Sequence, residues 1–105
     1  MSTGILIVLV TCPPATVDAL AVSLVSERLA ACVNIIPQVR SIYRWKDAVQ
    51  KDDESLLVIK TAADRYETLK AAILARHPYE LPEILAVNPA HGHAPYLDWI
   101  LASTH

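Results

Sequence analysis

Glycine is scarce in this chain, since only two of its 105 residues are glycine. Loops that wrap around phosphate groups depend on several closely spaced glycines, so a P-loop and a dinucleotide-binding loop are both excluded. The H-E-x-x-H pattern of zinc proteases and the serine turn of α/β-hydrolases are also missing, and no serine has an evident His–Asp companion. Because the sequence contains no catalytic pattern, we predict that the protein is not an enzyme.

Charged residues are few, at 19% of the chain, and the net charge is −2 without a basic cluster. Nucleic-acid-binding domains carry a basic patch, so we expect no nucleic-acid partner. The two cysteines, Cys12 and Cys32, form neither a C-x-x-C metal pair nor a disulfide framework, and we expect reduced thiols. The apolar run Ile5–Val10 is six residues long and lacks a basic flank, so it predicts neither a membrane span nor a signal peptide. We therefore expect a cytoplasmic protein without a membrane partner.

Hydrophobic residues are abundant by comparison, at 53% of the chain. The length suggests a single domain, residues 1–105. Because this hydrophobic share is high for a small monomer, we expect another copy of the chain to cover part of the apolar surface.

Strand-like and helical spacings of apolar residues alternate along the chain. The continuous run Ile5–Val10 predicts a strand buried on both faces, whereas Val17, Leu20 and Leu24 recur at helical spacing. The full pattern predicts strands at 5–10, 32–45, 54–61 and 83–88, helices at 15–31, 63–76 and 95–103, and a polar turn at 46–53. The order β-α-β-β-α-β-α predicts an α+β, ferredoxin-like fold, in which an antiparallel sheet has helices on one face and an extra helix at the C-terminus.

Finer features can be predicted as well. Pro37 cannot donate to a strand ladder, so it marks a bulge or an edge. Thr61 followed by Asp64 resembles a capping box for the helix at 63–76. The sheet face without helices would carry apolar residues of the second and third strands, and an oligomer could cover it.

The densest group of polar side chains lies at residues 76–83, Arg-His-Pro-Tyr-Glu-Leu-Pro-Glu. The two prolines stiffen this segment, and it falls between a predicted helix and a predicted strand. Imidazole beside carboxylates, as in His77 and Glu83, suits a transition metal such as copper, and the same groups suit a small organic ligand. The alternative is that His77 and Tyr79 only end a helix and fill a loop.

Other candidates come with equally plain alternatives. Cys12, at the end of the first strand, would suit Cu(I) or is simply a buried thiol. Lys60 could meet an anion, or it is a solvated residue paired with Glu54. Tyr43 and Trp45 share one face of a strand and are better explained by a subunit contact than by a ligand platform. His91 and His93 could chelate a metal, but such pairs are common.

Several motifs, in the right order, give the chain a resemblance to the divalent-cation tolerance (CutA) family. It covers nearly the whole chain, from Val8 to Leu101. The motifs are Leu29–Pro37, Ser41–Trp45, Ile59–Thr61, His77–Ile84 and Tyr96–Ile100. The resemblance implies a ferredoxin-like protomer in a tight homotrimer, similar to PII signalling proteins, and a link to tolerance of copper and other divalent ions.

The resemblance also implies a copper site, which this sequence matches in part. The family's site uses a cysteine at the end of the first strand and two adjacent histidines before the Pro-Tyr pair. Here His77 matches the second histidine and Arg76 replaces the first. Val10 takes the cysteine position, with Cys12 two residues later. Arg76 repels a cation and suits an anion.

Two functional hypotheses follow, beside a third interpretation of the chain as a purely structural trimer with a very stable core. The first is a trimeric protein of divalent-metal response, with copper or another divalent ion at His77 and Cys12. The second is a PII-like protein that binds a small anionic metabolite and a partner protein. The ligand-binding residues expected around an inter-subunit cleft are Tyr43, Lys60, Arg76, Tyr79 and Glu83.

Overall fold

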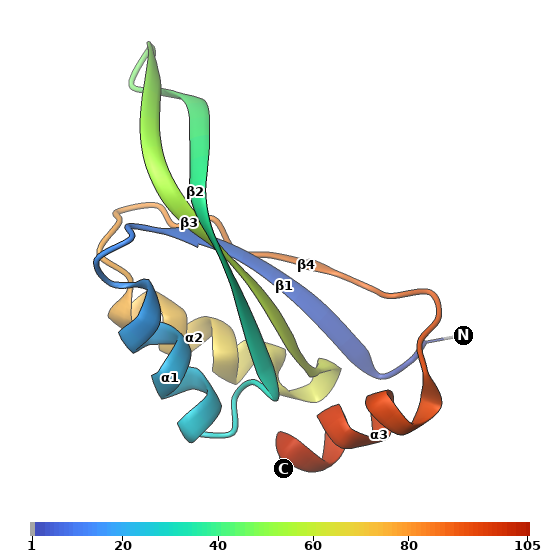
Figure 1. The fold of residues 1–105 in the computed structure, drawn as a ribbon. Helices are drawn as coiled ribbons and strands as arrows, with labels where there is room; N and C mark the ends of the chain where they lie inside the picture. Colours follow the sequence, from blue (N-terminus) through green and yellow to red (C-terminus); the bar gives the residue numbers. More distant parts are fainter. Residues whose placement is uncertain (1) are drawn as a thin grey trace.

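The computed structural model describes residues 2–105, which form a four-stranded sheet and three α-helices (Figure 1). The elements in chain order are β1 (Ile5–Cys12), α1 (Val17–Ser26), β2 (Cys32–Trp45), β3 (Ala48–Ala62), the 3-10 turn η1 (Ala63–Arg65), α2 (Tyr66–Arg76), β4 (Leu85–Val87) and α3 (Ala94–Ser103). The strand order is β2-β3-β1-β4, and every neighbouring pair is antiparallel. The predicted α+β, ferredoxin-like arrangement with an extra C-terminal helix is confirmed.

One face of the sheet carries the main core. Alternate residues of the two central strands point to this face, and Val10 is paired with Leu57 in the register. Helices α1 and α2 cover the face and bury Leu24, Leu69 and Ile73 against it (Figure 1). Helix α3 packs separately, through Ile100, on Ile5 at the first residue of β1. Helices α1 and α2 therefore leave the second face of the sheet open, apart from its end at Ile5, where α3 packs.

The open face is apolar. Ile7 and Leu9 of β1 pair with Val87 and Leu85 of β4, so the four side chains point to the same side. Leu85 is 59% exposed and Val87 is 49% exposed. The expectation of an uncovered apolar face is confirmed, and β4 contributes to it as well as β2 and β3.

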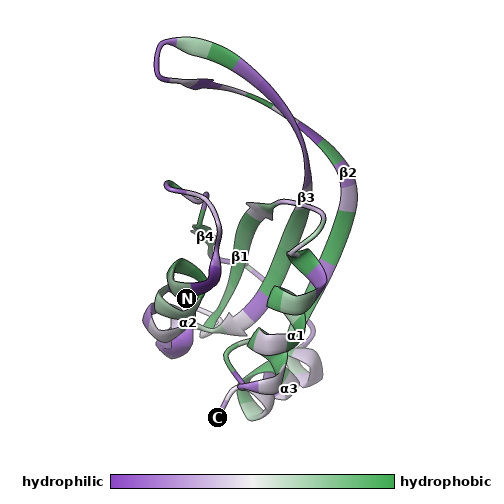
Figure 2. Ribbon diagram, turned by 90° about the vertical axis from the view of Figure 1, so that its left-hand side faces the viewer, coloured by the Kyte–Doolittle hydropathy of each residue, from purple (hydrophilic) through white to green (hydrophobic). Residues whose placement is uncertain are grey.

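The hairpin of β2 and β3 extends well beyond the body as an arm (Figures 1 and 2). We define the arm as residues 39–53, in which Arg40 pairs with Asp53 and Trp45 with Ala48, while Val39 pairs with Glu54 at the foot of the arm. The turn consists of Lys46 and Asp47 alone, with φ of 51° and 62°. The prediction of a polar turn at 46–53 is therefore wrong, because β3 begins at Ala48. The arm has no core beneath it, so its strands carry polar residues on both faces and lack the usual alternation.

A bulge separates the arm from the rest of the sheet. The register between β2 and β3 shifts between Ile36 and Val39, and Gln38 has a φ of 60°. The bulge predicted from Pro37 is confirmed. Because a bulge bends a strand and increases its twist, it directs the arm away from the body.

The first predicted helix is too long at its C-terminal end, because α1 stops at Ser26. Arg28 has a φ of 60°, which no helix accommodates, and the amides of Leu29 and Ala30 both donate to the carbonyl of Leu24. This turn buries Leu29 and Ala30, whose apolar character gave them a helical appearance in the sequence.

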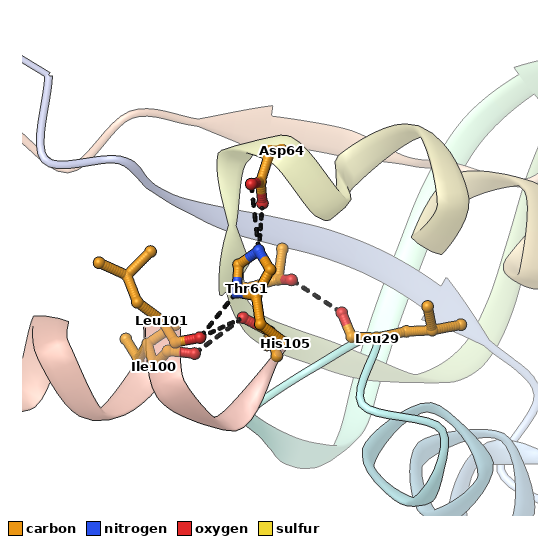
Figure 3. Close-up of polar contacts among 7 residues, drawn as sticks. Leu29, Thr61, Asp64, Ile100, Leu101 and His105 are labelled. Carbon is orange, nitrogen blue, oxygen red and sulfur yellow. Dashed lines mark hydrogen bonds and ion pairs between the residues drawn. The ribbon is translucent and has the colours of Figure 1, made fainter.

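The capping box at Thr61 is also wrong. Its hydroxyl donates to the carbonyl of Leu29 at 2.7 Å and does not cap the turn that follows (Figure 3). Figure 3 shows a second contact nearby, where the imidazole of His105 donates to the Leu101 carbonyl at 2.8 Å and to the Asp64 carboxylate at 2.9 Å. This contact connects the end of α3 to η1.

No helix within residues 2–105 is long and apolar enough to cross a membrane.

Candidate functional site

A cavity of about 630 Å³ lies between the arm and the loop that joins α2 to β4. Figure 1 shows this loop running beside the base of the arm. Thr11 and Glu54 have the same orientation in the register as Leu56, so the cavity opens on the side of the sheet that the helices leave uncovered. The lining residues are Thr11, Ser41, Ile42, Tyr43, Trp45, Glu54, Pro78, Tyr79, Glu80, Leu81 and Glu83.

The lining of the cavity is acidic. It includes the carboxylates of Glu54, Glu80 and Glu83, and none of its residues is lysine, arginine or histidine. The apolar part comes from aromatic and aliphatic side chains, among them Trp45 and Leu81. A cavity with such a lining favours cations over anions.

Glu54 is the buried carboxylate of the site, with only 5% of its surface exposed. The hydroxyl of Tyr79 donates to Glu54 Oε2 at 2.8 Å, which fixes the loop against the arm. Burial raises the pKa of the Tyr79 phenol above its ordinary value, and this hydrogen bond raises it further, so the phenol stays a donor at neutral pH. Tyr43 likewise donates its hydroxyl to Asp52, and that bond is the main cause of a raised pKa at Tyr43.

His77, the residue that follows α2, is buried and does not line the cavity. Its Nε2–H donates to the carbonyl of Thr11 at 2.7 Å, and its Nδ1 accepts from the amide of Tyr79 at 3.1 Å. These bonds require the neutral, Nε2-protonated ring and use both nitrogens. His77 therefore positions Tyr79, and a metal could bind it only if one of the two bonds broke.

Cys12 is fully buried, at the end of β1 opposite Ser55. Burial, with a smaller effect of the Glu54 charge, raises the pKa of its thiol to about 11. The protonated thiol is a poor metal ligand, because metals bind the thiolate. Within residues 2–105, no group of three or more His, Cys, Asp or Glu side chains is arranged to hold a metal ion.

The two expected anion-binding residues lie elsewhere. Arg76 turns toward α1, where it donates to Ser23 Oγ at 3.0 Å and to Glu27 Oε1 at 2.7 Å. Lys60 lies near the far end of β3 and donates to Asn34 of β2. Its suggested pairing with Glu54 is wrong. Of the five ligand-binding residues expected from the sequence, the structure brings together Tyr43, Tyr79 and Glu83 only.

Sequence reasoning missed Glu54 as a site residue. The signal was available, because Glu54 alternates with Leu56 and Val58 in β3 and so places a carboxylate on an apolar face. Its place at the foot of the arm was hidden by the expected turn at 46–53. Trp45 was considered for a subunit contact, and the structure adds that it lines the cavity.

Comparison with known proteins identifies similar chains over almost the full length. A family model described as "CutA1 divalent ion tolerance protein" matches residues 6–103. The chain is 48% identical over 99 residues to the divalent-cation tolerance protein CutA of Thermus thermophilus, covering 93% of this chain and 96% of the relative. The chain spans 52% of the length of the mouse protein CutA, to which it is 44% identical over 92 residues.

Solved structures agree with the fold. The structure of the divalent cation tolerance protein from Thermus thermophilus superposes with a TM-score of 0.93 at 45% identity, covering 96% of this chain and 99% of the other. The structure described as a PII-like protein CutA from Nostoc sp. PCC 7120 in apo form gives a TM-score of 0.92 at 37% identity, covering 95% and 97%.

Proposed function

Since the chain belongs to the CutA1 divalent ion tolerance family, we propose that it acts in the response to divalent metal ions, copper among them, as a homotrimer with ligand clefts between subunits. The observation that carries the proposal is the acid-lined cavity, which opens on the uncovered face of the sheet. We expect a neighbouring copy of the chain to cover this face and to complete the wall of the cavity.

The open face supports the homotrimer. Ile36 of β2, at 46% exposure, joins the exposed Leu85 and Val87 of β4 on this side, and half-buried Val58 and Leu9 lie between them. A continuous apolar patch of this kind marks an interaction surface. Arms without their own core also gain stability by packing on neighbouring copies.

The cavity supports the cleft. Carboxylate oxygens such as those of Glu80 and Glu83 are ligands that divalent cations accept, and both residues are exposed and accessible. Residues 2–105 of one chain hold no group of three or more His, Cys, Asp or Glu side chains arranged to bind a metal ion, so a neighbouring subunit would complete the coordination.

Between the two candidate metal positions, the cavity is favoured over His77 and Cys12. The carboxylates are free to bind, whereas the His77 ring nitrogens are engaged and the Cys12 thiol is buried and protonated. Copper at His77 and Cys12 remains the rival assignment.

Calorimetric titration with Cu²⁺, Zn²⁺ and Mg²⁺ tests the proposal. We expect the wild type to bind at least one ion, and the double variant Glu80→Gln, Glu83→Gln to bind it about tenfold more weakly, since each lost carboxylate removes a charged ligand. We expect His77→Ala, checked for folding by circular dichroism, to keep the wild-type affinity. Loss of affinity in His77→Ala alone would transfer the site to the rival position, and no binding by the wild type would refute the metal role.

A second candidate function is a PII-like sensor of a small anionic metabolite, suggested by the similarity to the Nostoc protein. The cavity of one chain has no cationic side chain, so an anion would need lysine or arginine residues from a neighbouring subunit. A thermal-shift screen of metabolites tests it, because a ligand of the native state raises the apparent stability. Stabilisation by anions and not by metal ions would favour this function.

A further inference from the structure

We propose that the cavity under Tyr79 binds a small organic cation, with an ammonium group directed at Glu54 and an apolar body against Trp45 and Leu81. A site for an organic cation goes beyond the response to metal ions, and the observations that support it are the charge, the volume and the lining of the cavity.

The first argument is the charge of Glu54. Its carboxylate is 5% exposed, and no ion pair among residues 2–105 includes it. Its one hydrogen bond in this part of the chain comes from the Tyr79 hydroxyl to Oε2, so Oε1 has no donor there. Among residues 2–105 the one buried side-chain nitrogen or oxygen without a hydrogen-bond partner is Arg65 Nε, so Oε1 of Glu54 is open to the cavity. An ammonium ion in the cavity would supply the opposite charge and a donor to Oε1.

The second argument is the size of the cavity. Its volume of about 630 Å³ falls in the range typical of small-molecule sites, roughly 300–1,000 Å³, and greatly exceeds the space one metal ion needs. A metal ion would engage carboxylates and leave the rest of this volume to water. An organic cation would fill it.

The third argument is the lining. Tyr43, Trp45 and Tyr79 supply aromatic rings, and Ile42 and Leu81 supply aliphatic surface. Aromatic faces attract ammonium groups, and the indole of Trp45 already has the ammonium of Lys46 at 5.7 Å from its ring centroid. Aromatic rings together with carboxylates suit a molecule that is apolar at one end and cationic at the other.

The sign of the ligand charge follows from the same residues. Three carboxylates line the cavity, and Asp52 lies next to it through its bond with Tyr43. The only two cations expected at the site from the sequence, Lys60 and Arg76, are bound to Asn34 and to Glu27 and Ser23. An anionic molecule of the same size would meet repulsion from these carboxylates, and the cation beside the lining, Lys46, lies over the Trp45 ring at the tip of the arm.

The test uses three probes with the same aromatic body and different charge: 2-phenylethylammonium, 2-phenylethanol and phenylacetate. Each is titrated into the full-length, assembled protein without metal, and binding is followed by NMR at the indole N–H of Trp45. Trp99 of α3 lies outside the cavity and serves as an internal reference. We expect shifts at Trp45 and not at Trp99, with the ammonium probe binding about tenfold more tightly than the alcohol, as a charge-assisted hydrogen bond implies. We expect no binding of phenylacetate.

Two variants locate the charge. Glu54→Gln keeps the shape of the side chain and should reduce the affinity for 2-phenylethylammonium to that for 2-phenylethanol. The double variant Glu80→Gln, Glu83→Gln changes only exposed residues at the rim of the cavity and should weaken binding of the ammonium probe. It can replace Glu54→Gln in the test if that variant does not fold. Glu67→Gln on the exposed side of α2 is the matched control and should bind as the wild type does.

The proposal would be overturned if the three probes bound with equal affinity, or if none of the cavity variants changed the affinity for 2-phenylethylammonium. Chemical-shift changes at Trp99 alone would overturn it as well. The result is separable from the metal titrations. If the protein binds copper and none of the probes, the proposed function stands and the organic-cation site is refuted. If it binds the ammonium probe and no metal ion, the organic-cation site stands and the metal role is refuted.

Discussion

At the scale of single residues, the contact between Glu54 and Tyr79 holds the site together. One carboxylate from the foot of the arm and one phenol from the loop after α2 meet at 2.8 Å, with the carboxylate buried. His77 supports the same loop through the Tyr79 amide. The histidine that the sequence singled out thus acts on the site through its backbone contacts.

Tyr79→Phe should destabilise the fold by about 1–3 kcal/mol, because it leaves a buried carboxylate oxygen without its donor. Chemical denaturation measures the change. Tyr96→Phe in α3 is the matched control, since Tyr96 is exposed, and should cost much less. In Glu54→Ala, which has no acceptor for the Tyr79 hydroxyl, the penalty of Tyr79→Phe should shrink, and an undiminished penalty would show that the two side chains do not interact.

His105 gives a prediction on pH. Its ring donates to Leu101 O and to Asp64, while Arg28 donates to its carbonyl at 3.3 Å and the Arg65 charge opposes protonation (Figure 3). The two ring bonds, the one to the Leu101 carbonyl first, raise the pKa of His105 above its ordinary value. A raised pKa in the folded state contributes stability below the ordinary value of about 6.5, and that contribution is lost as pH rises through the folded pKa.

Thermal melts of the wild type and His105→Ala between pH 5 and pH 9 test this, as a range of about two units on each side of neutrality spans a histidine titration. The wild type should be the more stable protein at the acidic end, and the two curves should converge at the alkaline end. His91→Ala, at an exposed loop position, should follow the wild type throughout. A constant difference between wild type and His105→Ala at all pH values would contradict the role of the charge.

At the scale of elements, the arm is the part that sequence patterns predicted least well. The apolar residues of β1 and the spacing in α2 reveal these elements directly, because each buries a face against the core. Residues 48–53 belong to a strand that has no core, so hydrophobic periodicity could not reveal it. Glu54 was missed because the expected turn at 46–53 hid its place at the foot of the arm, although the motifs of residues 29–37 and 77–84 pointed to the right fold and family.

The turn of the arm can be tested by stabilising it. Lys46 and Asp47 hold positive φ values of 51° and 62°, a conformation that strains lysine, that aspartate and asparagine tolerate better, and that glycine adopts without strain. The pair Lys46→Asn, Asp47→Gly should therefore raise the free energy of unfolding by about 1 kcal/mol. The pair Asp52→Asn, Asp53→Gly inside β3 should instead lower the free energy of unfolding. A loss of stability in the turn variant would contradict the two-residue turn.

At the scale of the whole molecule, the proposed homotrimer would cover the open face and support the arm. The protomer is elongated, 44 Å by 27 Å by 23 Å, and Ile36, Leu85 and Val87 expose apolar side chains on the open face of the sheet. The cavity opens on that side, so assembly and ligand binding are linked in this account. Copies that cover the face would also complete the cavity walls.

Leu85→Asp should disrupt this assembly, because it places a charge on the apolar face between subunits. Light scattering of the wild type should give three times the protomer mass of 11.5 kDa, and the variant should give a lower mass. Val22→Asp is the matched control, since Val22 is 65% exposed on α1, away from the open face, and should keep the trimer. Trp45→Asp on the arm should also lower the mass. A full-mass assembly in both Leu85→Asp and Trp45→Asp would place the interface elsewhere.

The acid-lined cavity at the foot of the arm is the proposed site of cation binding. Anomalous scattering from crystals soaked in Cu²⁺ or Zn²⁺ tests it most directly, because it locates the metal without a variant. We predict a peak inside the cavity, at about 2.0–2.2 Å from a carboxylate oxygen of Glu54, Glu80 or Glu83. A peak between His77 and Cys12, with the cavity empty, would contradict the account.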